Sequence, residues 1–125
     1  AKRVVVATPY VDRVNEIEKK FLEDNGFEVL NIKGLQNLDP DLMPRTPLRQ
    51  MYHLTKEVLN PAADAIFVSC TGLGIAHGIN MMERDFGLPV VTSNQASLWG
   101  ALRCLPCNVR SKTLIRIWSE LEWRR

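Results

Sequence analysis

Short apolar runs alternate along the chain with segments whose apolar residues recur every three or four positions. Residues 4–7 form a β-branched run that Thr8-Pro9 ends, which predicts a buried first strand. After it, one face of a predicted amphipathic helix carries Val14, Ile17, Phe21 and Leu22, and the charged residues lie mostly on the other. An Asn-Gly pair then supplies the helix stop. This part of the chain therefore predicts a buried strand followed by a surface helix.

The alternation continues beyond this helix. Residues 27–32 alternate and are apolar enough for a second strand, and residues 34–47 hold three of the seven prolines, which predicts a loop. Thr46-Pro47 is expected to be a helix N-cap followed by proline at the first helical position. That helix should stop before Pro61. Two further strand–helix pairs are predicted over residues 65–70, 74–86, 88–91 and 92–103.

Strand–helix alternation of this kind predicts a parallel sheet with right-handed crossovers and helices on both faces. The simplest arrangement is a single doubly wound α/β domain whose four-stranded sheet has the flavodoxin-like order 2-1-3-4. We expect this domain over residues 1–105. Residues 106–125 carry a basic, Trp-bearing pattern and are expected to form a divergent helical tail.

The composition limits the class of protein. At 125 residues, with 46% hydrophobic and 24% charged residues, the chain is typical of one soluble globular domain. No apolar stretch approaches the roughly 20 residues that span a bilayer, so we expect no membrane partner. A formal net charge of +2 gives no field that favours nucleic acid as a partner.

The chain has three cysteines, Cys70, Cys104 and Cys107, and no leader-like amino terminus. Both features favour a reducing, cytoplasmic location over a disulfide framework. Cys104 and Cys107 have the spacing of a thioredoxin-like motif, but they close the last helix instead of following an early strand, and two cysteines are too few for structural zinc. We therefore expect no metal site. His53 and His77 are expected to face solvent or to cap helices.

Cys70 closes an apolar strand and opens a turn of small residues before a predicted helix. At the carboxyl end of a buried strand, a thiol faces the crevice that open α/β sheets use for ligands. The predicted helix would point its unpaired amides and positive dipole end at the sulfur, and such a site favours thiolate over thiol. A buried structural cysteine is the open alternative for this feature alone.

Polar segments follow strands one, three and four, at residues 8–10, 69–72 and 93–95. Because parallel strands end at the same edge, we expect these segments to share one crevice. The amides after Cys70, which Gly72 leaves free to approach a ligand, suit a carboxylate or an enolate oxygen. Tyr10 would add a phenolic hydrogen bond. An exposed helix start for Tyr10 and a helix cap for Asn94 remain open as alternatives.

The chain also resembles a known family. The resemblance rests on residues 8–16, 21–29, 32–35, 63–73, 87–96 and 98–99. In these segments the chain is similar to the aspartate/glutamate racemase superfamily, in particular its maleate isomerase and arylmalonate decarboxylase branch. The likeness covers about residues 3–103 and is to the second of two pseudo-symmetric α/β lobes.

This resemblance implies roles for single residues. Cys70 falls on the second-lobe catalytic cysteine and Tyr10 on the active-site tyrosine. Thr71 and Gly72 fall on the turn whose amides hold a substrate carboxylate or the enediolate. The remaining residues that we expect to bind substrate are Thr8, Pro9 and Asn94. The implied function is a cofactor-independent isomerase, decarboxylase or racemase that acts on a small carboxylic acid.

Two departures from the family pattern leave alternatives open. The first lobe, which should supply a partner cysteine, has no counterpart in this sequence. In the loop after strand two, maleate isomerases tend to show an Asp-Asn pair, whereas this chain has Asp39-Pro40. The alternative is therefore a catalytically silent remnant, or a complementing subunit, that self-associates as a homo-oligomer or pairs with a first-lobe chain.

Overall fold

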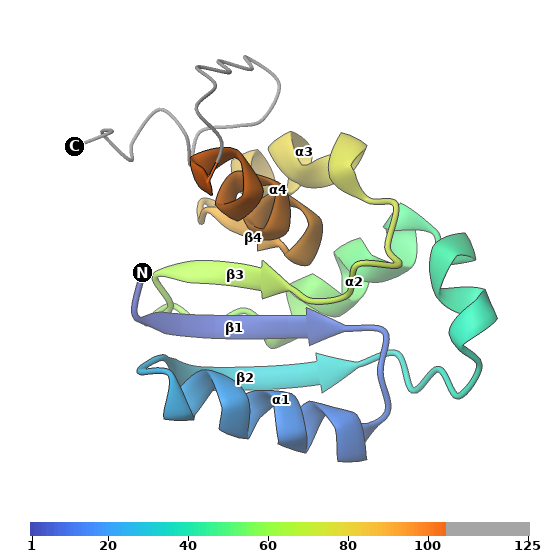
Figure 1. Ribbon diagram of the computed structural model, residues 1–125, viewed down its shortest axis with the longest axis horizontal. Coiled ribbons are helices and arrows are strands. Elements are labelled where there is room, and N and C mark those ends of the chain that lie inside the picture. The colour runs from blue at the N-terminus through green and yellow to red at the C-terminus, as the bar shows by residue number, and fades with distance from the viewer. Residues whose placement is uncertain (105–125) are drawn as a thin grey trace.

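The four strands form one parallel sheet in the order β2-β1-β3-β4 (Figure 1). The structure is a computed structural model, and it describes residues 1–104. The strands are β1 (Arg3–Thr8), β2 (Glu28–Gly34), β3 (Ala65–Val68) and β4 (Val90–Thr92). The predicted α/β class and strand order are confirmed.

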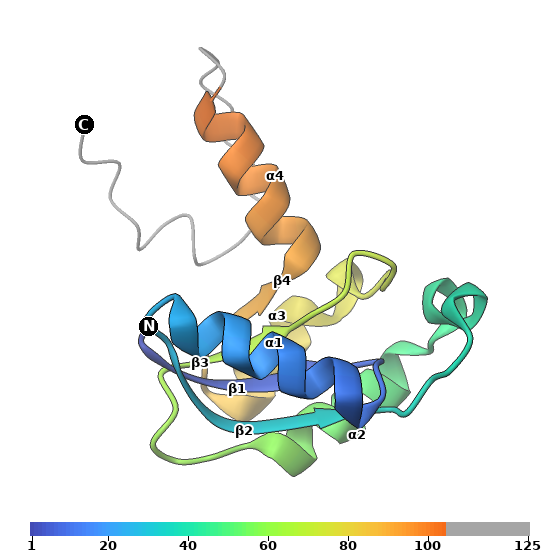
Figure 2. The same ribbon diagram turned by 60° about the horizontal axis from the view of Figure 1, so that its bottom comes forward.

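Helices cover both faces of this sheet. They are α1 (Asp12–Asp24), α2 (Leu48–Val58), α3 (Ile79–Phe86) and α4 (Ser93–Cys104), with short 3-10 helices η1 (Pro40–Arg45) and η2 (Ala76–Gly78). Alternate residues of the central strand β1 point to opposite faces, because side chains in a strand alternate. Val5 and Ala7 pack with α2 and α3 in the larger core, whereas Val4 and Val6 belong to a smaller cluster with Leu22 of α1. Figure 2 shows α1 on one side of the sheet and α2 on the other, with α4 rising from the end of β4.

Several boundaries differ from the prediction. The expected loop over residues 34–47 contains η1, and the helix expected from residue 74 begins as η2 and continues as α3 only from Ile79. Pro47, not Thr46, is the N-cap of α2, because Thr46 still belongs to the end of η1. The expected boundary at residue 105 and the tail over 106–125 lie outside the described residues.

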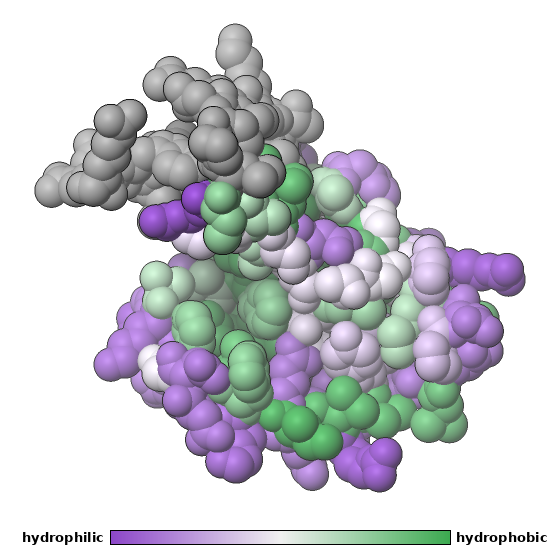
Figure 3. All heavy atoms as spheres, in the orientation of Figure 1, coloured by the Kyte–Doolittle hydropathy of each residue, from purple (hydrophilic) through white to green (hydrophobic). Residues whose placement is uncertain are grey.

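The orientation of α1 is also a correction. Ile17 is 67% exposed and Phe21 is 64% exposed, although the apolar spacing predicts that they face the core. The helix instead turns towards the sheet with Asn15, whose Oδ1 accepts a 2.6 Å hydrogen bond from the Thr8 hydroxyl, and with Leu22, which packs against the smaller core cluster as predicted. Figure 3 shows apolar side chains along the lower edge of the molecule, where α1 lies. One apolar strip of α1 is therefore not covered by the described part of the chain.

Two carboxylates hold the amino edge of the sheet. Asp64 accepts hydrogen bonds from the backbone N–H groups of Lys2 (3.0 Å) and Arg3 (2.8 Å) and pairs with the Arg3 guanidinium (2.9 Å). On the other side, buried Glu83 of α3 accepts a hydrogen bond from the Val90 N–H through Oε1 (2.9 Å). Each carboxylate ties the start of one strand to a neighbouring element.

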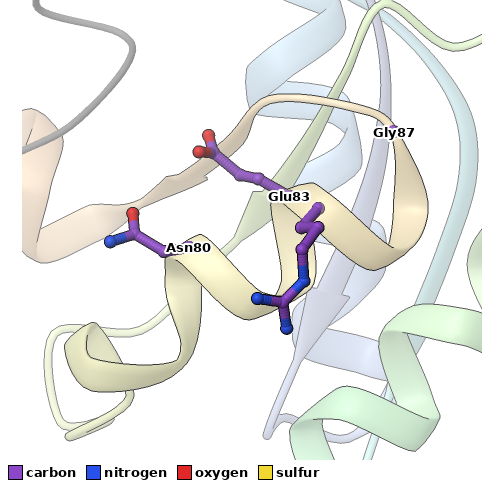
Figure 4. A pocket seen from close by; sticks show the side chains of 4 residues that line it. Asn80, Glu83 and Gly87 are labelled. Carbon is purple, nitrogen blue, oxygen red and sulfur yellow. The ribbon is translucent and has the colours of Figure 1, made fainter.

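A shallow depression of about 500 Å³ lies beside α3, lined by Asn80, Glu83, Arg84 and Gly87 (Figure 4). Its lining runs along α3 from Asn80 to Gly87 and includes none of the predicted site residues. Among residues 1–104, no helix is both long enough and apolar enough to cross a membrane.

Replacing Glu83 by alanine should destabilise the fold by about 1–3 kcal/mol, because it leaves the buried Val90 N–H without an acceptor. Urea unfolding followed by circular dichroism measures the loss. Glu83→Gln keeps an Oε1 acceptor and is the matched control, so it should lose much less. Equal losses in the two variants would contradict this role for the hydrogen bond.

The Arg3 side chain and the Lys2 and Arg3 amides hold the pKa of the Asp64 carboxyl well below its ordinary value. A carboxyl with a depressed folded-state pKa stabilises the fold above about pH 4, and this stabilisation is lost as the pH falls towards the folded-state pKa. The wild type should therefore be more stable than Asp64→Asn at pH 7, and the difference should narrow at pH 3. Urea midpoints at both pH values test this, and a constant difference would refute it.

Candidate active site at the carboxyl edge of the sheet

Cys70 lies two residues beyond the end of β3, in a strained backbone conformation. Its φ of 146° belongs to the region that favours glycine, and holding a side chain there costs on the order of 1–3 kcal/mol. Ser69 N–H still donates to the Ala7 carbonyl (3.0 Å), so the chain leaves the sheet only at Cys70. The residue is 7% exposed. This edge of the sheet therefore carries a thiol that is almost fully buried and is attached to a strained backbone.

The sulfur of Cys70 is contacted from its own turn and from η1. The Gly72 N–H donates to Sγ (3.3 Å), and the Sδ atom of Met43, from η1, lies 3.8 Å from Sγ. The prediction that amides at the start of the next helix point at the sulfur is wrong, because α3 begins only at Ile79 and the N–H that points there belongs to Gly72 in the turn.

Asn94 sets the direction of that amide. Its side-chain Nδ2 donates to the carbonyls of Thr71 (3.2 Å) and Leu73 (3.3 Å). In a trans peptide the carbonyl and the following N–H point in opposite directions. Holding the Thr71 carbonyl therefore turns the Gly72 N–H away from Asn94 and towards Cys70 Sγ.

The first turn of α4 fixes Asn94. Thr92 N–H donates to Gln95 Oε1 (2.8 Å), and Gln95 N–H donates to Thr92 Oγ1 (3.2 Å), which is a capping box. Between them, Ser93 Oγ accepts a hydrogen bond from the Cys70 N–H (3.1 Å). The T-x-x-Q spacing is readable in the sequence and is the signal by which this support could have been found.

Tyr10 lies beside the thiol, half-buried. Burial raises the pKa of its phenol above the ordinary value, interaction with Cys70 raises it further, and the Ser69 hydroxyl opposes the rise. At neutral pH Tyr10 is therefore an uncharged phenol, which can donate a hydrogen bond. Its backbone N–H donates to Thr8 Oγ1 (3.0 Å), so Thr8 supports the residue from inside the fold.

Glu18 of α1 is a titratable group that the sequence analysis did not select. Burial raises the pKa of its carboxyl, and the Ser69 hydroxyl partly opposes the rise. Ser69 therefore interacts with both Glu18 and Tyr10. No sequence signal marks Glu18, because it stands among the charged residues of an amphipathic helix.

Gly34, the last residue of β2, packs directly against the Tyr10 backbone. A Cβ atom at this position would lie 1.9 Å from the Tyr10 carbonyl oxygen and 2.7 Å from Asn15 Nδ2. The following residues pair with the same loop, since Leu35 N–H donates to the Thr8 carbonyl and Asn37 N–H to the Pro9 carbonyl (both 3.0 Å). Only glycine permits this close approach.

The structure thus brings Tyr10, Cys70, Gly72 and Asn94 to one edge. Thr8 and Pro9 are buried and Thr71 is exposed, and contact of any of these residues with substrate stays a prediction. His77 is exposed in η2. Within residues 1–104, no three His, Cys, Asp or Glu side chains gather as a metal site would require.

The fold and this edge define one lobe of an Asp/Glu racemase-like protein, in the branch of arylmalonate decarboxylase and maleate isomerase. The family model described as arylmalonate decarboxylase matches residues 1–118. The chain belongs to the arylmalonate decarboxylase family.

Curated relatives agree with this assignment. The chain is 33% identical over 104 residues to arylmalonate decarboxylase of Bordetella bronchiseptica, covering 82% of this chain and 43% of that protein. It is 27% identical over 106 residues to maleate isomerase of Nocardia farcinica (strain IFM 10152), covering 84% and 42% respectively. The chain therefore spans less than half of the length of these relatives.

Solved structures show the same fold. A crystal structure of arylmalonate decarboxylase superposes with a TM-score of 0.84 at 30% identity, over 95% of this chain and 54% of that one. Nocardia farcinica maleate cis-trans isomerase bound to TRIS gives 0.84 at 25% identity, over 95% and 50%. A Cys-to-Ser mutant of the Nocardia enzyme, with a TM-score of 0.79 at 25% identity over 82% and 42%, holds a covalently bound succinylcysteine intermediate.

Gly34→Ala should displace the Tyr10 loop, because the new methyl group meets backbone on one side and Asn15 on the other. We expect a loss of about 1–3 kcal/mol or more in the free energy of unfolding. Gly100→Ala is the matched control, since nothing lies within 4 Å of its Cβ position, and it should be neutral or slightly stabilising. Urea unfolding of both variants measures these free energies. A Gly34→Ala protein as stable as the wild type would contradict the close packing at this position.

Met43→Ala should expose the Cys70 thiol, because Met43 Sδ is in contact with the sulfur. We expect several-fold faster alkylation of Cys70 by iodoacetamide, measured by mass spectrometry of its peptide. The alkylation rate of exposed Cys104 in the same molecule shows whether the reagent is equally active in each sample. Leu42→Ala changes an exposed residue of the same η1 and is the matched control. An unchanged Cys70 rate in Met43→Ala would show that Met43 does not cover the thiol.

Proposed function

We propose that this chain is one lobe of a cofactor-independent isomerase, decarboxylase or racemase that acts on a small carboxylic acid, with Cys70 as its catalytic cysteine. The observation that carries the proposal is the thiol itself. It receives the Gly72 N–H, is held in a strained turn, and lies beside the neutral phenol of Tyr10. Family membership supports the general kind of reaction.

In a decarboxylase reaction, the bond between the α-carbon and one carboxylate breaks, carbon dioxide leaves, and the electron pair stays as an enediolate. Donors aimed at the enediolate oxygens lower the barrier. Of the two turn amides that are expected to hold the enediolate, the Gly72 N–H already donates to Cys70 Sγ, so the Thr71 N–H and the Tyr10 phenol are the proposed donors. Cys70 then gives its S–H proton to the α-carbon, and the resulting thiolate is reprotonated from solvent.

In an isomerase reaction, a second cysteine thiolate adds to one carbon of the maleate double bond, and Cys70 protonates the neighbouring carbon. Rotation about the resulting single bond, followed by return of that proton and loss of the thiolate, gives the trans isomer. The succinylcysteine intermediate of the Nocardia mutant supports this variant of the proposal. The higher identity to arylmalonate decarboxylase supports the decarboxylase variant.

The second half of such a site must come from another lobe. Because the chain covers less than half of its curated relatives, we propose a first-lobe partner, or a second copy of this chain, as the source of the remaining groups. The uncovered strip with Ile17 and Phe21 favours the competing hypothesis of a catalytically silent lobe that associates through its surface.

The proposal is tested with a chimera that joins this chain to the unmatched half of the Bordetella bronchiseptica enzyme. We expect the chimera to convert an arylmalonate or maleate, and in D₂O the decarboxylation product should carry deuterium at the α-carbon. Cys70→Ala should lower the rate by about 100-fold or more, as expected for the loss of a general acid. Product formation is followed by proton NMR.

Cys104→Ala is the matched control, because Cys104 is exposed at the end of α4, and its activity should equal that of the parent chimera. A chimera that is folded by circular dichroism but converts neither substrate would refute the proposal and favour the silent lobe. Full activity in Cys70→Ala would refute the role of this cysteine.

A further inference from the structure

Gln36 connects the loop after β2 to the Tyr10 loop. It has a φ of 61°, in the left-handed region that favours glycine, so its conformation is held by its contacts. The backbone N–H of Gln36 donates to the carbonyl of Tyr10 (3.1 Å). A strained backbone next to a candidate catalytic residue is a reason to ask what holds it.

The Gln36 side chain completes the start of α1. Its Oε1 accepts a hydrogen bond from the Asp12 N–H (3.2 Å), and its Nε2 donates to Asp12 Oδ1 (2.7 Å) and to the Gly34 carbonyl (3.3 Å). The N-cap residue of α1, Val11, has no side chain that can accept such a bond. Gln36 therefore supplies, from another loop, the cap that the helix lacks.

Tyr10 is consequently held from both sides. Thr8 Oγ1 accepts the Tyr10 N–H on the strand side, and Gln36 binds the Tyr10 carbonyl and Asp12 on the helix side. We propose that Gln36 and Asp12 form a positioning pair that holds the Tyr10 phenol against Cys70. The catalytic importance of this pair rests on the proposed function.

The competing view is an ordinary surface cap that stabilises α1 and leaves Tyr10 unaffected. Both Gln36 and Asp12 are exposed, so a loss of stability alone does not separate the two views. The surroundings of the Tyr10 ring do separate them. Because burial raises the pKa of Tyr10, a loosened loop should rehydrate the phenol and lower that pKa.

The experiment uses the full chain labelled with 3-fluorotyrosine, whose ring fluorine is read by ¹⁹F NMR. The chain has only two tyrosines, Tyr10 and Tyr52, so Tyr52→Phe assigns the Tyr10 signal. Fluorination makes the phenol more acidic, which brings the titration into an accessible pH range. The variants compared are Gln36→Ala, Asp12→Ala and their double mutant.

Two controls match these changes. Asp12→Asn keeps an Oδ1 acceptor for Gln36 Nε2, so its Tyr10 signal should match that of the wild type. Lys20→Ala removes the exposed Lys20–Asp24 pair of the same helix and should leave Tyr10 unchanged.

We expect Gln36→Ala and Asp12→Ala each to move the Tyr10 resonance towards its position in urea and to lower the Tyr10 pKa. The double mutant should shift it no further than Gln36→Ala does, because within the described residues the Asp12 side chain makes its one hydrogen bond with Gln36 Nε2. A Tyr10 signal and pKa that stay unchanged in both folded single variants would overturn the proposal. No substrate is added, so this outcome is independent of whether the proposed reaction occurs.

Discussion

The parallel pairing of β1 with β3 is the constraint on which the site depends. Residues Val4 to Ala7 lie opposite Ala65 to Val68, and β2 flanks the other side of β1 in the same direction. Parallel strands in register end together, so the loop with Tyr10 and the turn with Cys70 must leave the sheet side by side. A slip of one residue would turn Val5 and Ala7 out of the larger core, and this cost fixes the register.

Beyond the strand ends, hydrogen bonds from side chains of α4 to the backbone of the Cys70 turn do most of the positioning. The Asn94 amide turns the Thr71–Gly72 peptide, and the Gly72 N–H then meets the Cys70 sulfur. The capping box of α4 holds Asn94, and Ser93 holds the Cys70 N–H. A short series of hydrogen bonds thus connects the first turn of α4 to the sulfur of Cys70. In the proposed reaction, such preorganised donors would need no rearrangement when charge develops on the substrate.

The described residues cover the Cys70 thiol but leave an apolar strip of α1 exposed. The thiol is nearly covered by Met43 from η1, whereas Ile17 and Phe21 of α1 face outward. The family proteins that the chain matches are about twice its length. Tyr10, Cys70 and the turn amides therefore constitute the contribution of a single lobe to a proposed two-lobe site.

The sequence by itself determined the α/β class, the strand order, and the presence of Cys70 and Tyr10 at one edge, because strand and helix periods and a shared sheet edge are local or topological properties. It did not determine the rotation of α1, since Ile17 and Phe21 have core-like spacing but the helix turns Asn15 and Leu22 towards the sheet instead. It did not reveal Met43, Glu18 or Gln36 either. These residues are far from Cys70 or Tyr10 along the chain, or stand among ordinary charged positions, and only tertiary contacts bring them to the site. The tertiary structure also decided the source of the amide at Cys70, because the turn continues to η2 before α3 begins.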